Sequence, residues 1–108
     1  MFKEILHNLY EMSNLSPEKS GLKEVIWFSV KGDTKHGPRI KVYKNKKPQG
    51  ENFSVTIEDN PKTIGKVFVN SKELQKIFEL VKVNKDILLK HWNYEIFSDE
   101  VIQNLIKV

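Results

Sequence analysis

The hydrophobic pattern of this chain changes its period near residue 70, and that change limits the folds open to it. Between residues 22 and 70, apolar residues alternate with polar ones or form short β-branched and aromatic runs, as they do in strands. From Ser71 onwards they recur every three or four residues, as on one face of a helix. Strands in a row followed by helices are typical of α+β proteins with a largely antiparallel sheet. The sequence therefore predicts an α+β fold.

Four segments carry the strand pattern, so we expect a three- to four-stranded, mostly antiparallel sheet. The segments are residues 22–31, 39–44, 53–57 and 66–69. The first is apolar at nearly every position, which predicts a central strand covered on both faces. We accordingly expect Trp27 in the core, together with Trp92 from the helical part.

Helical patterns lie on both sides of the expected sheet. Residues 2–12 predict an amphipathic N-terminal helix, and Ser16 and Pro17 favour one short helical turn in the connector that follows. After the sheet, Ser71 is the expected N-cap of a helix, and further helical segments follow at residues 84–93 and from Ser98. These C-terminal helices should pack on one face of the sheet through Leu74, Ile77, Phe78, Val81, Leu88, Trp92, Val101, Ile102, Leu105 and Ile106.

The length of 108 residues fits one domain, 1–108. We divide it into the N-terminal helix and connector (1–21), the sheet (22–70) and the helical part (71–108). The chain has no cysteine, which excludes disulfides and thiol chemistry and suits a reducing cytoplasm. The start carries Glu4 and Glu11 within its apolar pattern, unlike a signal peptide, and no apolar run approaches the roughly 20 residues of a membrane span. We expect a cytoplasmic protein with no membrane partner.

Positive charge is concentrated in residues 31–47. This basic window holds six lysines and the only arginine against one acid, Asp33, although the whole chain has a net charge of only +4. Its turn signal at residues 36–38 leads into the alternation Arg39-Ile40-Lys41-Val42-Tyr43, in which Arg39, Lys41 and Tyr43 share one face of a strand. Clustered, ordered charge of this kind points to an anionic partner.

We therefore expect a non-enzymatic binding protein whose partner is nucleic acid or an acidic protein or nucleoprotein. Lysines would neutralise phosphates and Tyr43 would stack on a base, while a single arginine favours backbone contact over base readout. The predicted binding residues are Lys31, Lys35, Arg39, Lys41, Tyr43, Lys44, Lys46 and Lys47. Two alternatives stay open: a solvated lysine-rich strand face that reflects composition alone, and a protein–protein interaction module that uses the N-terminal helix or exposed aromatic residues.

Catalysis is a further alternative. His36, Arg39 and Tyr43 supply a general acid or base and cationic or hydroxyl groups, which metal-free RNA cleavage needs, so a toxin-type small ribonuclease is possible on these residues. The five glycines are dispersed, and no metal-ligand spacing links the three histidines, which lie in different elements. We expect no metal and no cofactor.

Residues 25–93 resemble a group of short bacterial proteins of unknown function. Those proteins carry a PPHFH-type turn and strand, a further strand, and a helix with a Leu-Leu-x-x-Trp signature. The corresponding pieces here are residues 36–43, 53–57 and 84–93, the last containing Leu88-Leu89-Lys90-His91-Trp92. The family's His-Phe-His is Arg39-Ile40-Lys41 here, so histidine-based chemistry does not carry over. The resemblance implies a similar fold and a mobile-element setting, with a toxin–antitoxin or phage-defence role. An anti-defence, anti-CRISPR-like inhibitor from a phage or mobile element fits the expected binding protein.

Overall fold

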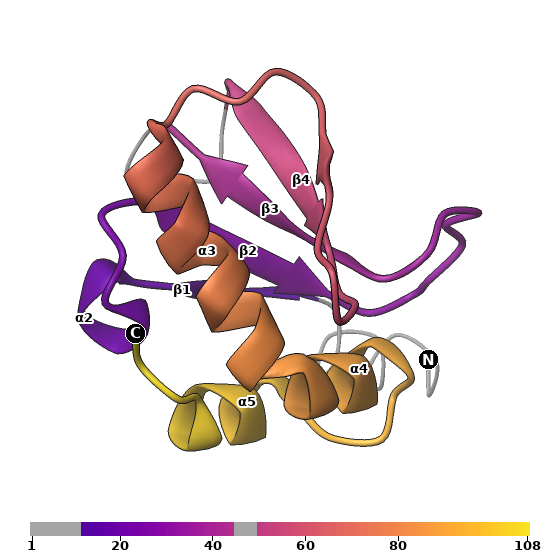
Figure 1. The fold of residues 1–108 in the computed structure, drawn as a ribbon. Helices are drawn as coiled ribbons and strands as arrows, with labels where there is room; N and C mark the ends of the chain where they lie inside the picture. The colour runs from indigo at the N-terminus through magenta and orange to yellow at the C-terminus, as the bar shows by residue number, and fades with distance from the viewer. Residues whose placement is uncertain (1–11, 45–49) are drawn as a thin grey trace.

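The sheet is an antiparallel meander of five strands, in which each strand pairs with its neighbours in the chain (Figure 1). A computed structural model describes residues 12–44 and 50–108. The strands are β1 (Met12–Leu15), β2 (Val25–Ser29), β3 (Arg39–Tyr43), β4 (Asn52–Thr56) and β5 (Thr63–Ile64). The described helices are α2 (Pro17–Ser20), α3 (Ser71–Val83), α4 (Lys85–Trp92) and α5 (Ser98–Asn104). The predicted α+β class is confirmed.

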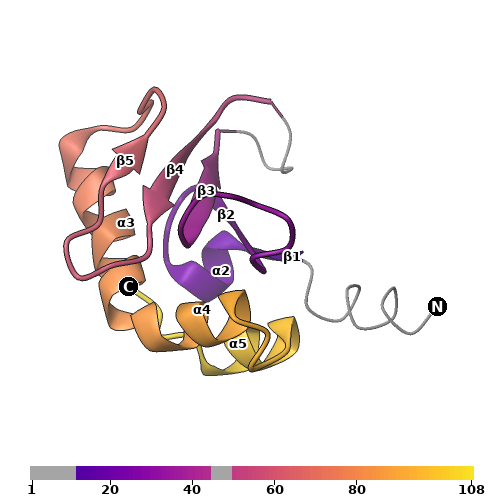
Figure 2. The same ribbon diagram turned by 90° about the vertical axis from the view of Figure 1, so that its right-hand side faces the viewer.

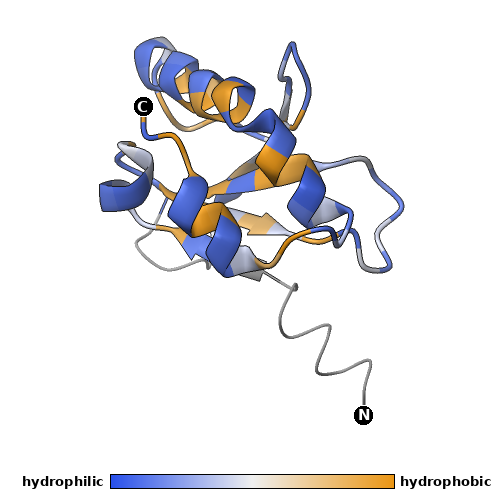
Figure 3. Cartoon of the chain, turned by 90° about the horizontal axis from the view of Figure 1, so that it is seen from below, coloured by the Kyte–Doolittle hydropathy of each residue, from blue (hydrophilic) through white to orange (hydrophobic). Residues whose placement is uncertain are grey.

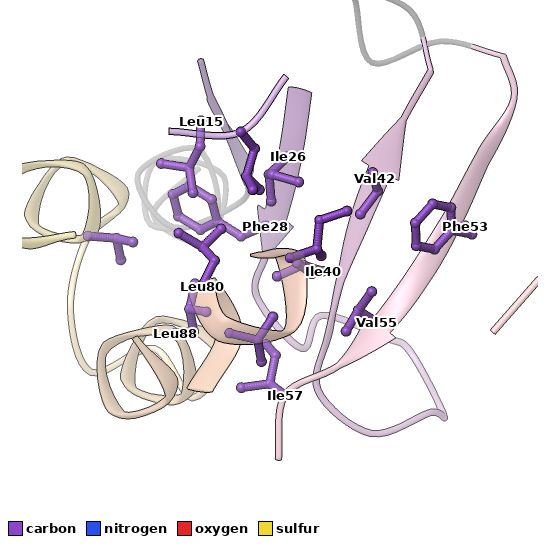
Figure 4. Packing of buried hydrophobic residues seen from close by; sticks show 14 residues of the cluster. Leu15, Ile26, Phe28, Ile40, Val42, Phe53, Val55, Ile57, Leu80 and Leu88 are labelled. Atoms are coloured by element: carbon purple, nitrogen blue, oxygen red, sulfur yellow. The ribbon is translucent and has the colours of Figure 1, made fainter. Parts of the chain in front are cut away.

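The core lies between one face of the sheet and α3 (Figure 4). The strands contribute every second residue to it, as the pleat requires, and α3 contributes Ile77, Leu80 and Val81. Each of these large apolar side chains gains about 1.5–3 kcal/mol from leaving water. The strand residues of this core are Leu15, Ile26, Phe28, Ile40, Val42, Phe53 and Val55.

The helices are arranged in two groups. Helix α3 crosses one face of the sheet, while α4 and α5 lie together at one end of it (Figures 1 and 2). Leu88 of α4 and Val101 of α5 extend the same core. Hydrophilic and hydrophobic residues alternate along these helices (Figure 3), as expected for helices with one buried side.

The sheet differs from the prediction at two places. Strand β1 lies within the segment expected to be a connector, where the predicted turn at Pro17 also forms as α2. The strand predicted at 66–69 is wrong, because the last strand is Thr63–Ile64. Gly65, at φ 100°, turns the chain away from β4, and the apolar residues that follow pack on the core without strand pairing. Phe68 contacts Phe53 edge-on, with ring centroids 5.1 Å apart.

The helical part follows the prediction more closely. The N-cap of α3 lies one residue earlier than predicted: the helix begins at Ser71, and the Asn70 side chain accepts a hydrogen bond from the Glu73 N–H at 2.8 Å. Trp92 is buried as expected, whereas Ile106, predicted to face inward, is 57% exposed. The predicted N-terminal helix falls on residues 1–11, outside the described part of the chain, and its last predicted residue, Met12, begins β1.

Candidate nucleic-acid interface

The candidate site lies on the side of the sheet opposite α3. Strands β2, β3 and β4 alternate there with the core residues, so their other side chains form what we call the outer face: Trp27, Ser29, Arg39, Lys41, Tyr43 and Ser54. Trp27 is directly opposite Lys41, and Lys41 is directly opposite Ser54. Because directly opposed residues share a face, this register places an aromatic ring beside a cation in the middle of the sheet.

Trp27 is the centre of the outer face. Its ring stacks on that of Tyr43, with centroids 5.5 Å apart and planes 29° apart. The Lys41 ammonium lies over the Trp27 ring at 5.2 Å from the centroid. Trp27 and Lys41 are half-buried, so each still presents part of its surface to solvent.

Two expectations about aromatic residues are corrected here. Trp27 does not reach the core, because the apolar run of β2 alternates like any strand and directs Trp27 away from α3. Tyr43 was predicted to stack on a base, yet it is only 4% exposed. Burial also raises the pKa of its phenol, which therefore stays protonated at neutral pH. Tyr43 supports the Trp27 ring and does not itself offer a face to a ligand.

The loop between β2 and β3 closes one end of the outer face; it projects to the right in Figure 1. Backbone contacts tie it to the helical part: the Lys31 N–H donates to the Trp92 carbonyl at 3.0 Å, and the Gly32 N–H donates to the Tyr94 hydroxyl at 3.0 Å. The Thr34 hydroxyl donates to the Lys31 carbonyl at 2.7 Å. These bonds hold the loop in a defined position.

A small cavity lies where this loop meets the strands. Its volume is about 90 Å³, and it is lined by Trp27, Ser29, Thr34, His36, Arg39 and Lys41. A neighbouring cavity of about 240 Å³ shares His36 and Arg39 and adds Glu58. The Glu58 carboxylate is held by the Thr56 hydroxyl, which donates to it at 2.5 Å.

The structure divides the predicted basic window. Lys31 and Lys35 are exposed on the loop before β3, whereas Lys44 follows β3 at its other end and pairs with Glu51 at 3.4 Å. A strand of this length separates its two ends by about 13 Å. Arg39 and Lys41 lie between them on the outer face. The predicted binding residues Lys46 and Lys47 lie outside the described residues.

The three residues of the ribonuclease alternative do not meet at one point. His36 and Arg39 line the same cavity, but Tyr43 does not line it and lies four residues beyond Arg39 on the strand, about 13 Å away. Among the described residues, no group of three histidine, cysteine or acidic side chains could hold a metal ion. In the same part of the chain, no helix has the length and apolar character needed to span a membrane.

A carboxyl pair lies near the Lys44 end of the sheet, and no sequence pattern indicates it. Glu24, just before β2, hydrogen-bonds the carboxyl group of Glu73 in α3. Burial, and then the hydrogen bond and charge of Glu73, raise the pKa of Glu24 from 4.5 to about 7. Two cavities of about 430 and 390 Å³ adjoin the pair, and both are lined by Lys23, Glu24 and Lys44.

Comparison of the chain with family models, with curated proteins and with solved structures finds no match. The resemblance based on residues 36–43 and 84–93 therefore stays a prediction. What the protein does has to be argued from its own surface.

Proposed function

We propose that this protein binds single-stranded nucleic acid on its outer face and does not cleave it. The observation that carries the proposal is the placement of Trp27, a partly exposed aromatic ring, in register with Lys41 and next to Arg39 on one strand face. Single strands are bound in this way, by aromatic rings that stack on bases and by cations that hold the intervening phosphates.

The composition of the face favours single strands over duplexes. Bases stack on a protein ring only when they are unpaired, and the outer face offers one such ring, Trp27. Apart from the buried Tyr43, the other outer-face groups are small hydroxyls and two cations, which bind phosphates and read no base sequence. Weak sequence preference is the expected result.

An anti-defence role, as expected from the sequence, belongs to the same proposal. In that setting, the outer face would bind the nucleic-acid component of a nucleoprotein in the cytoplasm. The observation that supports this extension is the chemistry of the face, because cations with a stacking ring suit nucleic acid better than an acidic protein surface, which needs no stacking ring.

The test is a binding titration with fluorescently labelled, single-stranded RNA and DNA of about ten nucleotides, followed by anisotropy between 50 and 300 mM salt. Each phosphate contact on a single strand contributes about −0.7 to the slope of log K against log salt, so about three contacts predict a slope near −2. RNA recovered intact after incubation supports binding without cleavage.

Substitution of Trp27 separates stacking from charge. Trp27→Phe keeps a ring and should keep most of the affinity, whereas Trp27→Leu should lose about tenfold or more, since a stacked base contributes about 1–3 kcal/mol. Equal affinity of the two variants, or no binding by the wild type at 50 mM salt, contradicts the proposal. Circular dichroism confirms that both variants are folded.

A further inference from the structure

Two buried N–H groups on the outer face lack an acceptor within the described part of the chain. They are Nε1 of Trp27 and Nε of Arg39, and neither has a hydrogen-bond partner among the described residues. Buried donors are almost always paired in native proteins, so an unpaired one needs an explanation such as a bound water, ion or ligand. Both residues line the same cavity of about 90 Å³.

The rest of the cavity wall is also suited to an anion. Lys41 adds an ammonium group and Ser29 a hydroxyl, and no carboxylate of residues 12–44 or 50–108 lines the cavity. The His36 ring also lines the cavity, and its Nδ1 lies 2.8 Å from the Gly37 carbonyl. The described wall of this cavity therefore offers hydrogen-bond donors and positive charge but no acid. Such a wall favours a negatively charged ligand that only accepts hydrogen bonds.

The size of the cavity limits the ligand further. A cavity of about 90 Å³ is small and has room for a group of the size of a tetrahedral oxyanion. The two fixed cations in its wall, Arg39 and Lys41, match the charge of about −1.5 to −2 on a phosphate monoester. Guanidinium groups bind phosphate oxygens through strong, charge-assisted hydrogen bonds.

We infer that this cavity is a binding site for one phosphate group, and specifically for a terminal phosphate. This inference rests on the proposed function, because the strand whose end enters the cavity is the one whose base stacks on Trp27. The loop that carries Thr34 and His36 forms one wall and is tied to Trp92 and Tyr94. A terminal phosphate is a monoester whose charge of about −1.5 to −2 matches the two cations, whereas an internal phosphodiester carries a single negative charge.

The first experiment is a titration with inorganic phosphate at constant ionic strength, followed by the indole N–H signals in a ¹H–¹⁵N NMR spectrum. The Trp27 N–H should shift as it gains an acceptor, and it should shift more than the Trp92 N–H, whose ring lies 5.8 Å from that of His36 in the cavity wall. Trp27→Phe assigns the two signals. Sodium chloride at the same ionic strength serves as the control for unspecific salt effects.

The second experiment compares two oligonucleotides of one sequence, with a 5′-phosphate and with a 5′-hydroxyl. We expect the phosphorylated strand to bind about tenfold tighter, as one or two charge-assisted hydrogen bonds provide. Arg39→Gln should abolish the difference, and Trp27→Phe, which keeps the ring and removes the N–H, should reduce it. Lys66→Gln is the matched control: it removes one exposed charge, but Lys66 does not line the cavity, so the difference should persist.

The outcomes separate the two proposals. Equal binding of both strands together with an unmoved Trp27 signal overturns the phosphate site and leaves single-strand binding intact. If phosphate shifts the Trp27 signal but neither strand binds, the cavity is a site for free phosphate, and the proposed function is overturned. A 5′-phosphate effect that survives both Arg39→Gln and Trp27→Phe places the phosphate elsewhere and also overturns this inference.

Discussion

The Lys41 ammonium lies over the face of the Trp27 ring, 5.2 Å from its centroid. The two residues are directly opposed on β2 and β3, so the sheet register itself fixes the contact. A half-buried cation–π pair contributes about 0.5–1 kcal/mol to folding. The same ammonium lies against the ring on which we place a base, so Lys41 connects the stability of the sheet with binding.

Replacement of Lys41 by methionine should separate these two contributions. Lys41→Met keeps the apolar stem and removes the charge, so the free energy of unfolding should fall by less than about 1 kcal/mol. Single-strand affinity should fall several-fold, and the salt slope should become shallower by about 0.7. Lys66→Met, at an exposed lysine outside the outer face, is the control. If Lys41→Met and Lys66→Met changed the single-strand affinity and the salt slope equally, Lys41 would have no special role.

Stability should decrease as the pH rises through neutrality, because of Glu24. Its pKa is raised to about 7 in the folded protein by burial and by Glu73, so the folded state holds the proton more tightly than the unfolded chain. The stabilisation is therefore complete below about pH 4.5 and is lost as the pH approaches and passes 7. One pKa unit corresponds to about 1.4 kcal/mol; since Glu24 is partly exposed and screened by solvent, we expect a loss of about 1–2 kcal/mol in total.

Urea unfolding of the wild type and of Glu24→Gln at pH 5.5 and 8 measures this effect. Glutamine cannot ionise, so the variant should be the more stable protein at pH 8 and should lack most of the wild-type pH dependence. Glu79→Gln, at an exposed site on the same helix as Glu73, should retain the wild-type dependence. Parallel pH profiles for wild type and Glu24→Gln would show that the Glu24–Glu73 contact does not control stability.

The sequence predicts those features of the architecture in which a residue's role follows from its neighbours in the chain. The alternation of Ile40 and Val42 with Arg39 and Lys41 is local, so the prediction of β3 and its two faces is confirmed. Trp27 was misplaced because an apolar residue on the outer face cannot be told from a core residue inside an apolar run. Its position becomes apparent only from the register with Lys41, which pairing between strands decides.

Other features depend on contacts between distant parts of the chain. Glu24 and Glu73 are 49 positions apart, and nothing near either residue indicates a shared proton. The β-branched residues Val67 and Val69 favour a strand, yet no strand edge is available to them once Gly65 turns the chain away from β4. Local propensity therefore gave way to packing on the core, as it commonly does in strands.

We predict that position 21 requires glycine. Gly21 has φ 84°, and a Cβ atom on it would lie 1.9 Å from the Val108 carbonyl oxygen. The Val108 N–H donates to the Ser20 carbonyl at 2.9 Å, so the segment before Val108 is docked on this turn. Gly21→Ala should lower the free energy of unfolding by about 1–3 kcal/mol, through backbone strain and loss of the docking contact.

Gly37→Ala is the control. A Cβ at Gly37 would meet nothing within 4 Å, so this substitution should change the free energy of unfolding little. Equal thermal stability of the two variants would contradict this.

We predict that the Asn84 side chain is needed to hold the segment before Val108 against the helices. Its Nδ2 donates to the Leu80 and Ile106 carbonyls, both at 2.9 Å, and its Oδ1 accepts from the Ile106 N–H at 2.7 Å. Asn84 is 2% exposed, so these groups have no water to replace the lost bonds directly. We expect Asn84→Ala to cost about 2–3 kcal/mol in urea unfolding and to speed hydrogen exchange at the Ile106 and Val108 amides. Asn104→Ala removes an exposed asparagine that bonds only within its helix, so it should cost well under 1 kcal/mol. If Asn84→Ala left both amides as protected as in the wild type, the docking of this segment would have to depend on its apolar contacts alone.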